Sequence, residues 1–241
     1  MTGRSRPLFP GRCAMIADNL KRVMDGIAEA AIVSERNPSD ITLVAVTKTR
    51  TVEEIGEALA AGVVHLGENR VQEAALKIPV VRGNPVWHLV GSLQSNKAAR
   101  AAELFGWIDS VHSEKVAGIL SERAEALGKT LDILVQVNIS GEESKSGVSP
   151  DEAGRIVSAV ERLPGIRLRG LMTIGSFGAP PDKTRREFRR MRELFDSLRS
   201  VPERRTPFDT LSMGMSGDFR IAIEEGSTMV RVGTAIFGER T

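Results

Sequence analysis

Lys48 is the first residue whose position suggests chemistry, because it directly follows a run of apolar and β-branched residues at 41–47. Such a run, without Gly or Pro, predicts a strand buried on both faces, as in parallel sheets covered by helices. Side chains alternate along a strand, so Val44, Val46 and Lys48 should share one face. Partial desolvation there favours the neutral amine, which can form a Schiff base. The alternative is a solvated lysine just beyond the strand.

Arg231 is a second charged residue in an apolar stretch. Within the predicted strand 228–232 it shares a face with Met229 and Gly233, so its guanidinium should point into the enclosed side of the sheet. An unpaired guanidinium is costly there, and it needs a carboxylate, a phosphate or a ring nitrogen as acceptor. The alternative is a structural ion pair with Glu224, Glu225 or Glu68.

Small and hydroxylated residues lie at the carboxyl ends of the last two predicted strands: Ser212, Gly214 and Ser216 at one, Gly233 and Thr234 at the other. Barrels often hold a phosphate with the loops after strands seven and eight and a short helix. Glycines let backbone N–H groups approach an anion, and a single turn at 235–237 would add free N–H groups. Ordinary loops are also rich in Gly and Ser, so a plain loop remains the alternative.

These residues need a fold that brings strand ends together. Strands are expected at 41–47, 63–67, 86–90, 107–111, 131–139, 167–173, 210–213 and 228–232. Helices are expected at 16–35, 52–61, 68–76, 95–104, 113–127, 151–163, 182–199 and 217–224. Strict alternation implies a parallel sheet with right-handed crossovers, and eight units suit a single closed (β/α)8 barrel with an added N-terminal helix. An open doubly wound sheet would need a Gly-x-Gly-x-x-Gly turn near 47–52, which is absent.

Helical periodicity begins near Met15, so we expect residues 1–14 to be a disordered extension and residues 15–241 a single domain. The 41% hydrophobic and 27% charged composition is that of a soluble globular protein. A net charge of +2 without a long basic run argues against a nucleic-acid surface, and the basic cluster 183–192 is expected to be a solvated helix face.

The single cysteine, Cys13, excludes an internal disulfide and indicates a reducing compartment, so we expect a cytoplasmic protein. No apolar run approaches the roughly 18 residues of a membrane span, and no secretory signal opens the chain. The three histidines lack metal-ligand spacing, so no metal site is expected.

Several longer motifs resemble the pyridoxal phosphate homeostasis proteins, also called the YggS or proline-synthetase-co-transcribed family. The fold of that family resembles the barrel domain of alanine racemase, a fold-type-III pyridoxal phosphate (PLP) barrel. The resemblance extends in order from about residue 41 to 238. The matching motifs are at residues 44–48, 67–73, 87–97, 138–140, 144–147, 169–172, 211–218 and 226–238.

The resemblance implies PLP as the cofactor and a role for each matching residue. Lys48 would form the internal aldimine, Asn69 would lie beside the ring, and Arg231 would face the pyridine nitrogen. The phosphate would be held by Ser212, Gly233 and Thr234 with backbone near Met215 and Ser216. The implied function is to hold PLP in vitamin B6 homeostasis and to pass it to apo-enzymes, and we expect a monomer.

Arg231 also bears on whether the protein is an enzyme. A protonated arginine donates to a ring nitrogen but cannot accept, so the pyridine would be a poor electron sink. Racemisation needs an acid–base group on each side of the substrate carbon. Alanine racemase uses a tyrosine, and this chain has none. We therefore expect a non-catalytic carrier. The alternatives are a small PLP-dependent amino-acid racemase using Lys48 with water or His88, and a scaffold that binds a partner protein.

Overall fold

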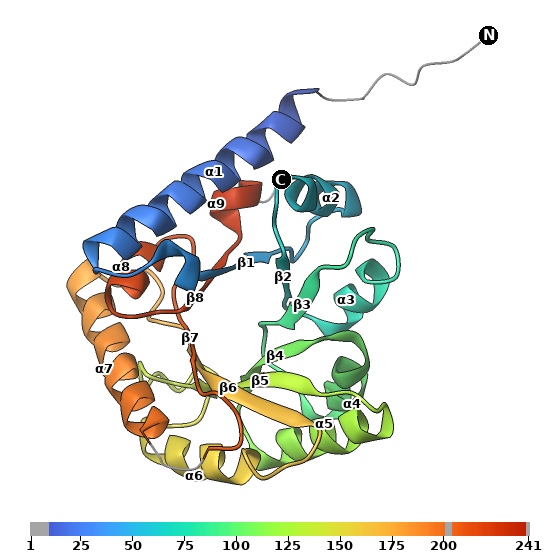
Figure 1. Cartoon of the computed structure of the whole chain (residues 1–241), viewed down its shortest axis with the longest axis vertical. Helices are drawn as coiled ribbons and strands as arrows, with labels where there is room; N and C mark the ends of the chain where they lie inside the picture. The colour runs from blue at the N-terminus through green and yellow to red at the C-terminus, as the bar shows by residue number, and fades with distance from the viewer. Residues whose placement is uncertain (1–9, 201–203, 240–241) are drawn as a thin grey trace.

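A computed structural model of the protein describes residues 10–200 and 204–239, and its eight parallel strands close into a barrel (Figure 1). Each strand pairs with the next one, and β8 returns to pair with β1. The expected (β/α)8 barrel is therefore confirmed. The strands are β1 (Thr42–Val46), β2 (His65–Glu68), β3 (Val86–Leu89), β4 (Trp107–Val111), β5 (Leu131–Val137), β6 (Ile166–Thr173), β7 (Thr210–Ser212) and β8 (Met229–Val232).

Helices form a ring outside the strands (Figure 1). They are α2 (Val52–Ala60), α3 (Val71–Lys77), α4 (Ser95–Leu104), α5 (Glu114–Ala126), α6 (Pro150–Val160), α7 (Pro181–Arg199) and α8 (Phe219–Glu224), followed by the short α9 (Thr234–Phe237). The reciprocal side-chain and backbone bonds of Thr51 and Glu54 start α2 at the expected residue. A single 3-10 turn at Pro38–Asp40 precedes β1 and was not expected from the sequence.

The additional N-terminal helix, α1 (Pro10–Val33), lies along the outside of the barrel and contacts α2, α8 and α9 (Figure 1). It begins at Pro10, six residues before the start expected at residue 16 (16 − 10), and ends at Val33, two residues before the end expected at residue 35 (35 − 33). Proline fits the first turn of a helix because its missing N–H has no partner there. The predicted extension therefore overlaps the helix at residues 10–14, and residues 1–9 lie outside the described part of the chain.

Two hydrophobic clusters fill the molecule. The smaller one lies inside the barrel and includes Val44 and Met229, with Val46 packed against it. The larger one lies between the strands and the helices and includes Ala45 and Val230. The alternation predicted for β1 and β8 is thus confirmed, since neighbouring residues of each strand lie in different clusters.

The basic cluster on α7 is only partly a solvated face. Arg185 pairs with Glu224 of α8 and with Glu225 directly after it, and Arg189 Nε lies 3.0 Å from Glu225 Oε2. These ion pairs connect two neighbouring helices. No helix of the described chain is long and apolar enough to cross a membrane.

Gly170 in β6 offers a test of the strand packing. Its φ is +150°, and a Cβ atom there would lie 1.9 Å from Thr210 O of β7. We expect Gly170→Ala to lower the free energy of unfolding by about 2–4 kcal/mol in urea denaturation, because backbone must move to admit the methyl group. Gly118→Ala in α5 is the control, since no atom lies within 4 Å of its added Cβ. The control should be neutral or stabilising by up to about 1 kcal/mol. Equal stabilities for the two variants would contradict this account.

Candidate functional site

A cavity of about 470 Å³ lies at the carboxyl ends of β1, β7 and β8. Its wall brings together six of the eight residues predicted from the sequence, separated by up to 186 positions in the chain (234 − 48). These six are Lys48, Met215, Ser216, Arg231, Gly233 and Thr234. Their convergence follows from barrel closure, because the carboxyl ends of all strands meet at one rim.

Lys48 is half-buried just beyond β1 and lines the cavity, as the strand alternation predicted. The backbone around it is held by a turn in which Thr49 has a φ of +63°. Thr49 N–H donates to Glu73 Oε1 at 2.5 Å, and Thr47 O accepts a 2.7 Å bond from Lys77 Nζ. These bonds fix the position from which the Lys48 amine enters the cavity.

The same turn is supported by a buried ion cluster behind β1. Lys77 Nζ lies 2.8 Å from Glu68 Oε1 and 2.6 Å from Glu73 Oε1. Glu68 has no exposed surface, and burial raises its pKa while the hydrogen bonds and charge of Lys77 and the hydroxyl of Thr47 oppose that shift. Lys77 therefore balances two carboxylates and holds the turn that carries Lys48.

Arg231 is buried in the barrel and reaches the floor of the cavity. Its Nη1 donates to Ser212 Oγ at 2.6 Å, and its Nη2 donates to Thr173 O at 2.7 Å. Burial lowers the pKa of Arg231, opposed by the charges of Asp109 and Asp218. An arginine nevertheless stays protonated in proteins, so this group can only donate.

The alternative of an ion pair between Arg231 and a nearby glutamate is wrong. Glu224 and Glu225 pair with Arg185, and Glu68 pairs with Lys77. Ser212, predicted to contact a phosphate directly, has no exposed surface and is not part of the cavity wall. Its hydroxyl instead accepts from Arg231, because both side chains point into the barrel from adjacent strands.

Two backbone N–H groups converge beside the start of α9. Gly233 N and Ala235 N donate to Ser216 Oγ at 3.2 and 3.3 Å. One oxygen atom is therefore already held by two converging N–H donors on the cavity wall. A phosphate oxygen is the same kind of acceptor, so the loops after β7 and β8 have the chemistry of an anion site.

Gly214 shapes the loop after β7. Its φ is +95°, and a Cβ atom there would lie 2.5 Å from the Cβ of Ala222, so only glycine fits. The turn brings Met215 N–H within 2.6 Å of Asp218 Oδ1. Burial raises the pKa of Asp218, opposed by the bond from Met215 and the charge of Arg231. Asp218 lines the cavity but received no role from the sequence, although it ends the motif 211–218.

Asn69 is not brought into the wall of this cavity. It lines a separate depression of about 510 Å³ with Arg70, Ser92 and Lys97, beyond the ends of β2 and β3. A Cβ atom on Gly91 would lie 2.3 Å from Asn69 O, so the loops after β2 and β3 pack directly on each other. The predicted place of Asn69 beside a cofactor ring stays a prediction.

His88, the candidate acid–base group of the racemase alternative, does not reach the barrel mouth. Its side chain has no exposed surface, and its ring nitrogens lie 3.0 Å from His65 Nδ1 and 3.0 Å from Asp109 Oδ1. Inward-facing side chains recur every second residue, so Val90 is the next one toward the mouth and His88 lies below it. No group of side chains in the described residues could hold a metal ion.

The loop between β6 and α7 supplies a wall that sequence reasoning missed. Ser176 and Phe177 of this loop line the cavity, together with Thr184 in the first turn of α7. Phe177 is 96% exposed, an unusual position for an aromatic side chain. A Gly- and Pro-rich loop carries no signal that would assign it to a cavity wall.

Comparison with known proteins identifies the class of this barrel. The model of the alanine racemase N-terminal domain family matches residues 26–241. The pyridoxal phosphate homeostasis protein of Pseudomonas aeruginosa is 44% identical over 226 residues, covering 93% of this chain and 96% of that protein. The Escherichia coli K12 protein of the same name is 43% identical over 229 residues, covering 93% and 97%. The chain therefore belongs to the pyridoxal phosphate homeostasis proteins within the alanine racemase N-terminal domain family.

Solved structures agree with this placement. PipY of Synechococcus elongatus, solved with PLP bound, is 35% identical with a TM-score of 0.80, covering 92% of this chain and 100% of that chain. Alanine racemase of Clostridium difficile is 17% identical with a TM-score of 0.68, covering 92% of this chain and 57% of that chain. The latter likeness shows the fold alone.

The raised pKa of Asp218 predicts how phosphate binding in the cavity depends on pH. We expect Asp218→Asn to bind inorganic phosphate roughly three- to tenfold more tightly above the raised pKa of Asp218, because the amide keeps the bond to Met215 without the negative charge. The advantage should fade as pH falls, since wild-type Asp218 then becomes protonated. Calorimetric titration at several pH values measures the effect, with Asp182→Asn at the exposed start of α7 as control. Identical affinities for wild type and Asp218→Asn at every pH would contradict it.

Proposed function

We propose that this protein binds pyridoxal 5′-phosphate on Lys48 and acts in the homeostasis of this cofactor inside the cell. The observation that carries the proposal is the convergence of three different groups on one cavity. They are the Lys48 amine, the Arg231 guanidinium and the N–H groups around Ser216. Membership of the pyridoxal phosphate homeostasis proteins supports the same conclusion.

The residues of the cavity fit the cofactor. A primary amine, a fixed cationic donor and paired N–H donors match its aldehyde, its ring nitrogen and its phosphate. When bound, the cofactor supplies a reactive aldehyde and a ring that can withdraw electrons. A cavity of about 470 Å³ is within the ordinary range for cofactors of this size.

Each residue would have a separate task. Lys48 would carry the covalent linkage, and Arg231 would donate to the ring nitrogen. Gly233 and Thr234, with backbone near Met215 and Ser216, would hold the phosphate. Ser212 would not touch the cofactor, but its hydroxyl accepts a hydrogen bond from Arg231 and so holds the guanidinium in place. Asn69 would flank the ring only if its side chain turns from the neighbouring depression toward Lys48.

We infer that the protein is a carrier and not a racemase. Arg231 is a donor only, so it would keep the ring nitrogen unprotonated and limit the stabilisation of a carbanion. The chain contains no tyrosine, and His88 is buried in hydrogen bonds to His65 and Asp109. A covalent but reversible linkage would shield the aldehyde from other amines and allow transfer to apo-enzymes that depend on PLP.

Lys48 offers a direct test of the linkage. After PLP is added and reduced with borohydride, we expect peptide mass spectrometry to find the cofactor on Lys48 in the wild type. Lys48→Ala should lose the visible absorbance band of the bound cofactor because it lacks the amine that condenses with the aldehyde. Lys97→Ala, at the same end of the barrel but in the neighbouring depression, is the control and should keep both signals. A wild type that takes up no PLP would overturn the proposed function.

Hydrogen exchange separates the carrier from the racemase. We expect PLP-loaded protein incubated with L-alanine in heavy water to give no more α-deuteration than the same concentration of free PLP. The physical reason is the donor-only contact of Arg231 with the ring nitrogen. Nuclear magnetic resonance of the α-proton and chiral chromatography provide the measurement. Sustained deuteration with inversion would instead establish racemase activity.

A further inference from the structure

Lys48 occupies the second position of a tight turn that follows β1. Thr47 O accepts a 3.0 Å hydrogen bond from Arg50 N–H, which closes a β-turn over residues 47–50. Thr49, at the third position, has a φ of +63°, whereas Lys48 is not among the described non-glycine residues with a positive φ. A positive φ at the third position alone defines a type II turn.

Threonine is an unfavourable residue for the third position of a type II turn. Glycine or asparagine normally occupies it, because a side chain branched at Cβ crowds the backbone when φ is positive. Glu35, just beyond α1, is the other described non-glycine residue with a positive φ, and it is not branched at Cβ. Strained backbone persists only where surrounding contacts hold it, and it concentrates at functional sites. The contacts that hold Thr49 therefore bear on the function of Lys48.

A carboxylate of α3 holds the peptide between Lys48 and Thr49. Glu73 Oε1 accepts a 2.5 Å hydrogen bond from Thr49 N–H. In a type I turn this peptide is reversed and φ of the third residue is negative, so Lys48 O would replace Thr49 N–H on the side of Glu73. A carboxylate oxygen accepts from an N–H group but cannot bond to a carbonyl oxygen. Glu73 thus stabilises the type II form against the type I form, which strains threonine less.

Lys77 lies one turn further along α3 and fixes both partners of this interaction. Residues four apart share one face of a helix. Lys77 Nζ lies 2.6 Å from Glu73 Oε1 and donates to Thr47 O at 2.7 Å. A carbonyl oxygen has two lone pairs, so Thr47 O can accept from Lys77 and Arg50 together. The ammonium is also held 2.8 Å from Glu68 Oε1, whose side chain has no exposed surface.

The type of turn determines how the Lys48 side chain is presented. Type I and type II turns differ by about 150° in ψ of the second residue. The rotamers open to a side chain depend on φ and ψ of its own residue. Lys48 lines the cavity in the type II form. A turn that exchanges between the two forms would present the amine in more directions, and fewer of them would suit condensation with an aldehyde.

We propose that Glu73 and Lys77 are positioning residues, which hold Thr49 in a strained type II turn so that the Lys48 amine keeps one orientation in the cavity. Neither of these described side chains is part of the cavity wall, so each acts through the backbone around Lys48. Glu73 belongs to the motif 67–73, from which only Asn69 was assigned to the predicted site. The part of this inference that concerns the cofactor rests on the proposed function, whereas the strained turn is a property of the protein alone.

Glycine at position 49 distinguishes this role from a general structural one. Glycine adopts a positive φ without strain, so Thr49→Gly removes the need for Glu73 to hold the turn. Glu73→Gln keeps an oxygen that can accept from both Thr49 and Lys77, whereas Glu73→Ala has none. Loss of the Glu73 side chain should therefore have a large effect when residue 49 is threonine and a small effect when it is glycine.

The first test uses the full chain without cofactor. Nuclear magnetic resonance should find a positive φ at Thr49 in the wild type and in Glu73→Gln, and a negative φ in Glu73→Ala. The Thr49 amide should exchange with heavy water about tenfold faster in Glu73→Ala, because its acceptor is gone. A negative φ at Thr49 in the wild type, or a Glu73→Ala variant with unchanged φ and exchange, would overturn the proposal whether or not the protein binds PLP.

The second test measures how fast added PLP condenses with the protein, followed by visible absorbance in a stopped-flow instrument. Glu73→Ala should slow condensation by about tenfold, because the amine is oriented less well. Glu73→Gln should stay close to the wild-type rate. Adding Thr49→Gly to Glu73→Ala should recover most of the lost rate, because the turn then holds itself. Lys77→Met should slow condensation, since both Glu73 and Thr47 O lose a donor.

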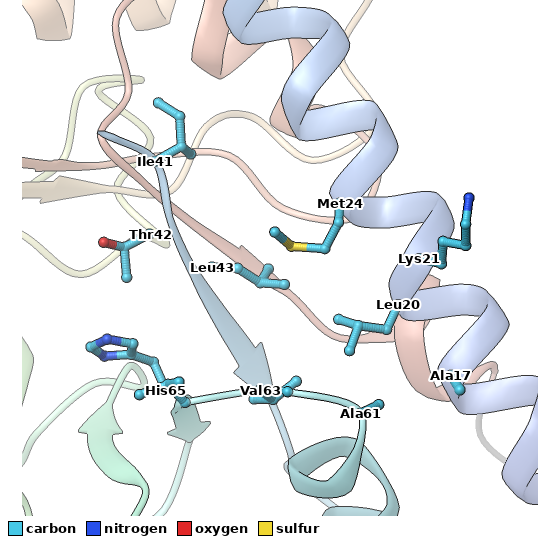
Figure 2. A pocket seen from close by; sticks show the side chains of 12 residues that line it. Ala17, Leu20, Lys21, Met24, Ile41, Thr42, Leu43, Ala61, Val63 and His65 are labelled. Atoms are coloured by element: carbon cyan, nitrogen blue, oxygen red, sulfur yellow. The ribbon is translucent and has the colours of Figure 1, made fainter. Parts of the chain in front are cut away.

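Two control variants match these changes elsewhere in the chain. Glu35→Gly relieves the other positive φ and should not rescue Glu73→Ala. Lys21→Met removes the cation of another i,i+4 pair, in which Lys21 Nζ lies 3.0 Å from Asp25 Oδ2. Lys21 lines a cavity of about 570 Å³ at the other end of β1, and Figure 2 shows it on α1, across from Thr42. This variant should condense with PLP at the wild-type rate.

The outcomes separate the possible failures. A Glu73→Ala variant that condenses as fast as the wild type, or a slow one that Thr49→Gly does not rescue, would overturn the proposal. Lys77→Met leaves Glu68 buried without its cation, and if it does not fold, the Glu73 series remains decisive, because that side chain is 25% exposed. A wild type that takes up no PLP would contradict the proposed function while leaving the measurements on Thr49 decisive.

Discussion

A guanidinium enclosed in a protein barrel is the constraint on which the rest of this site depends. Arg231 is almost fully buried, and it is held by a hydroxyl of β7 and a carbonyl at the end of β6. Its charge must be balanced, and its remaining N–H donors need acceptors. In this barrel the same side chain forms the floor of the cavity that Lys48 enters. The position of Ser212, which accepts a hydrogen bond from Arg231, follows from that requirement.

Barrel closure explains why residues so far apart in the chain act together. β1 pairs with β8 in a register that places Val44 beside Arg231, so Lys48 and Gly233 emerge at the same rim. The turn after Lys48 is then fixed from behind by Lys77 and its two glutamates. The site therefore has an amine on a fixed turn on one side and a loop with converging N–H donors on the other. Such a geometry suits a cofactor that is bound at both its aldehyde and its phosphate.

Local patterns in the sequence predicted much of this architecture. Alternation along 41–47 and 228–232 placed Lys48 and Arg231 on the inward face, because a two-residue period is a property of the strand itself. Closure of the barrel followed from the number of strand–helix units. Six of the eight predicted site residues line one cavity for that reason.

Local patterns do not determine the structure where depth along the barrel or the choice of a partner decides. His88 has the inward orientation expected of β3, but its depth along the barrel depends on the stagger between strands, which no single segment encodes. Ser212 binds Arg231 because two adjacent strands bring them together at one level. Asn69 follows the packing of its loop against Gly91, and Phe177 lies in a loop without periodicity. These are tertiary effects that local patterns do not contain.

A crystal structure of the protein with pyridoxal 5′-phosphate would test the central claim most directly. The account predicts continuous electron density from Lys48 Nζ to the cofactor, with the ring nitrogen facing Arg231 and the phosphate beside Ser216 and Gly233. Density for the cofactor in the depression lined by Asn69 and Lys97, or a Lys48 amine that does not touch it, would contradict the account.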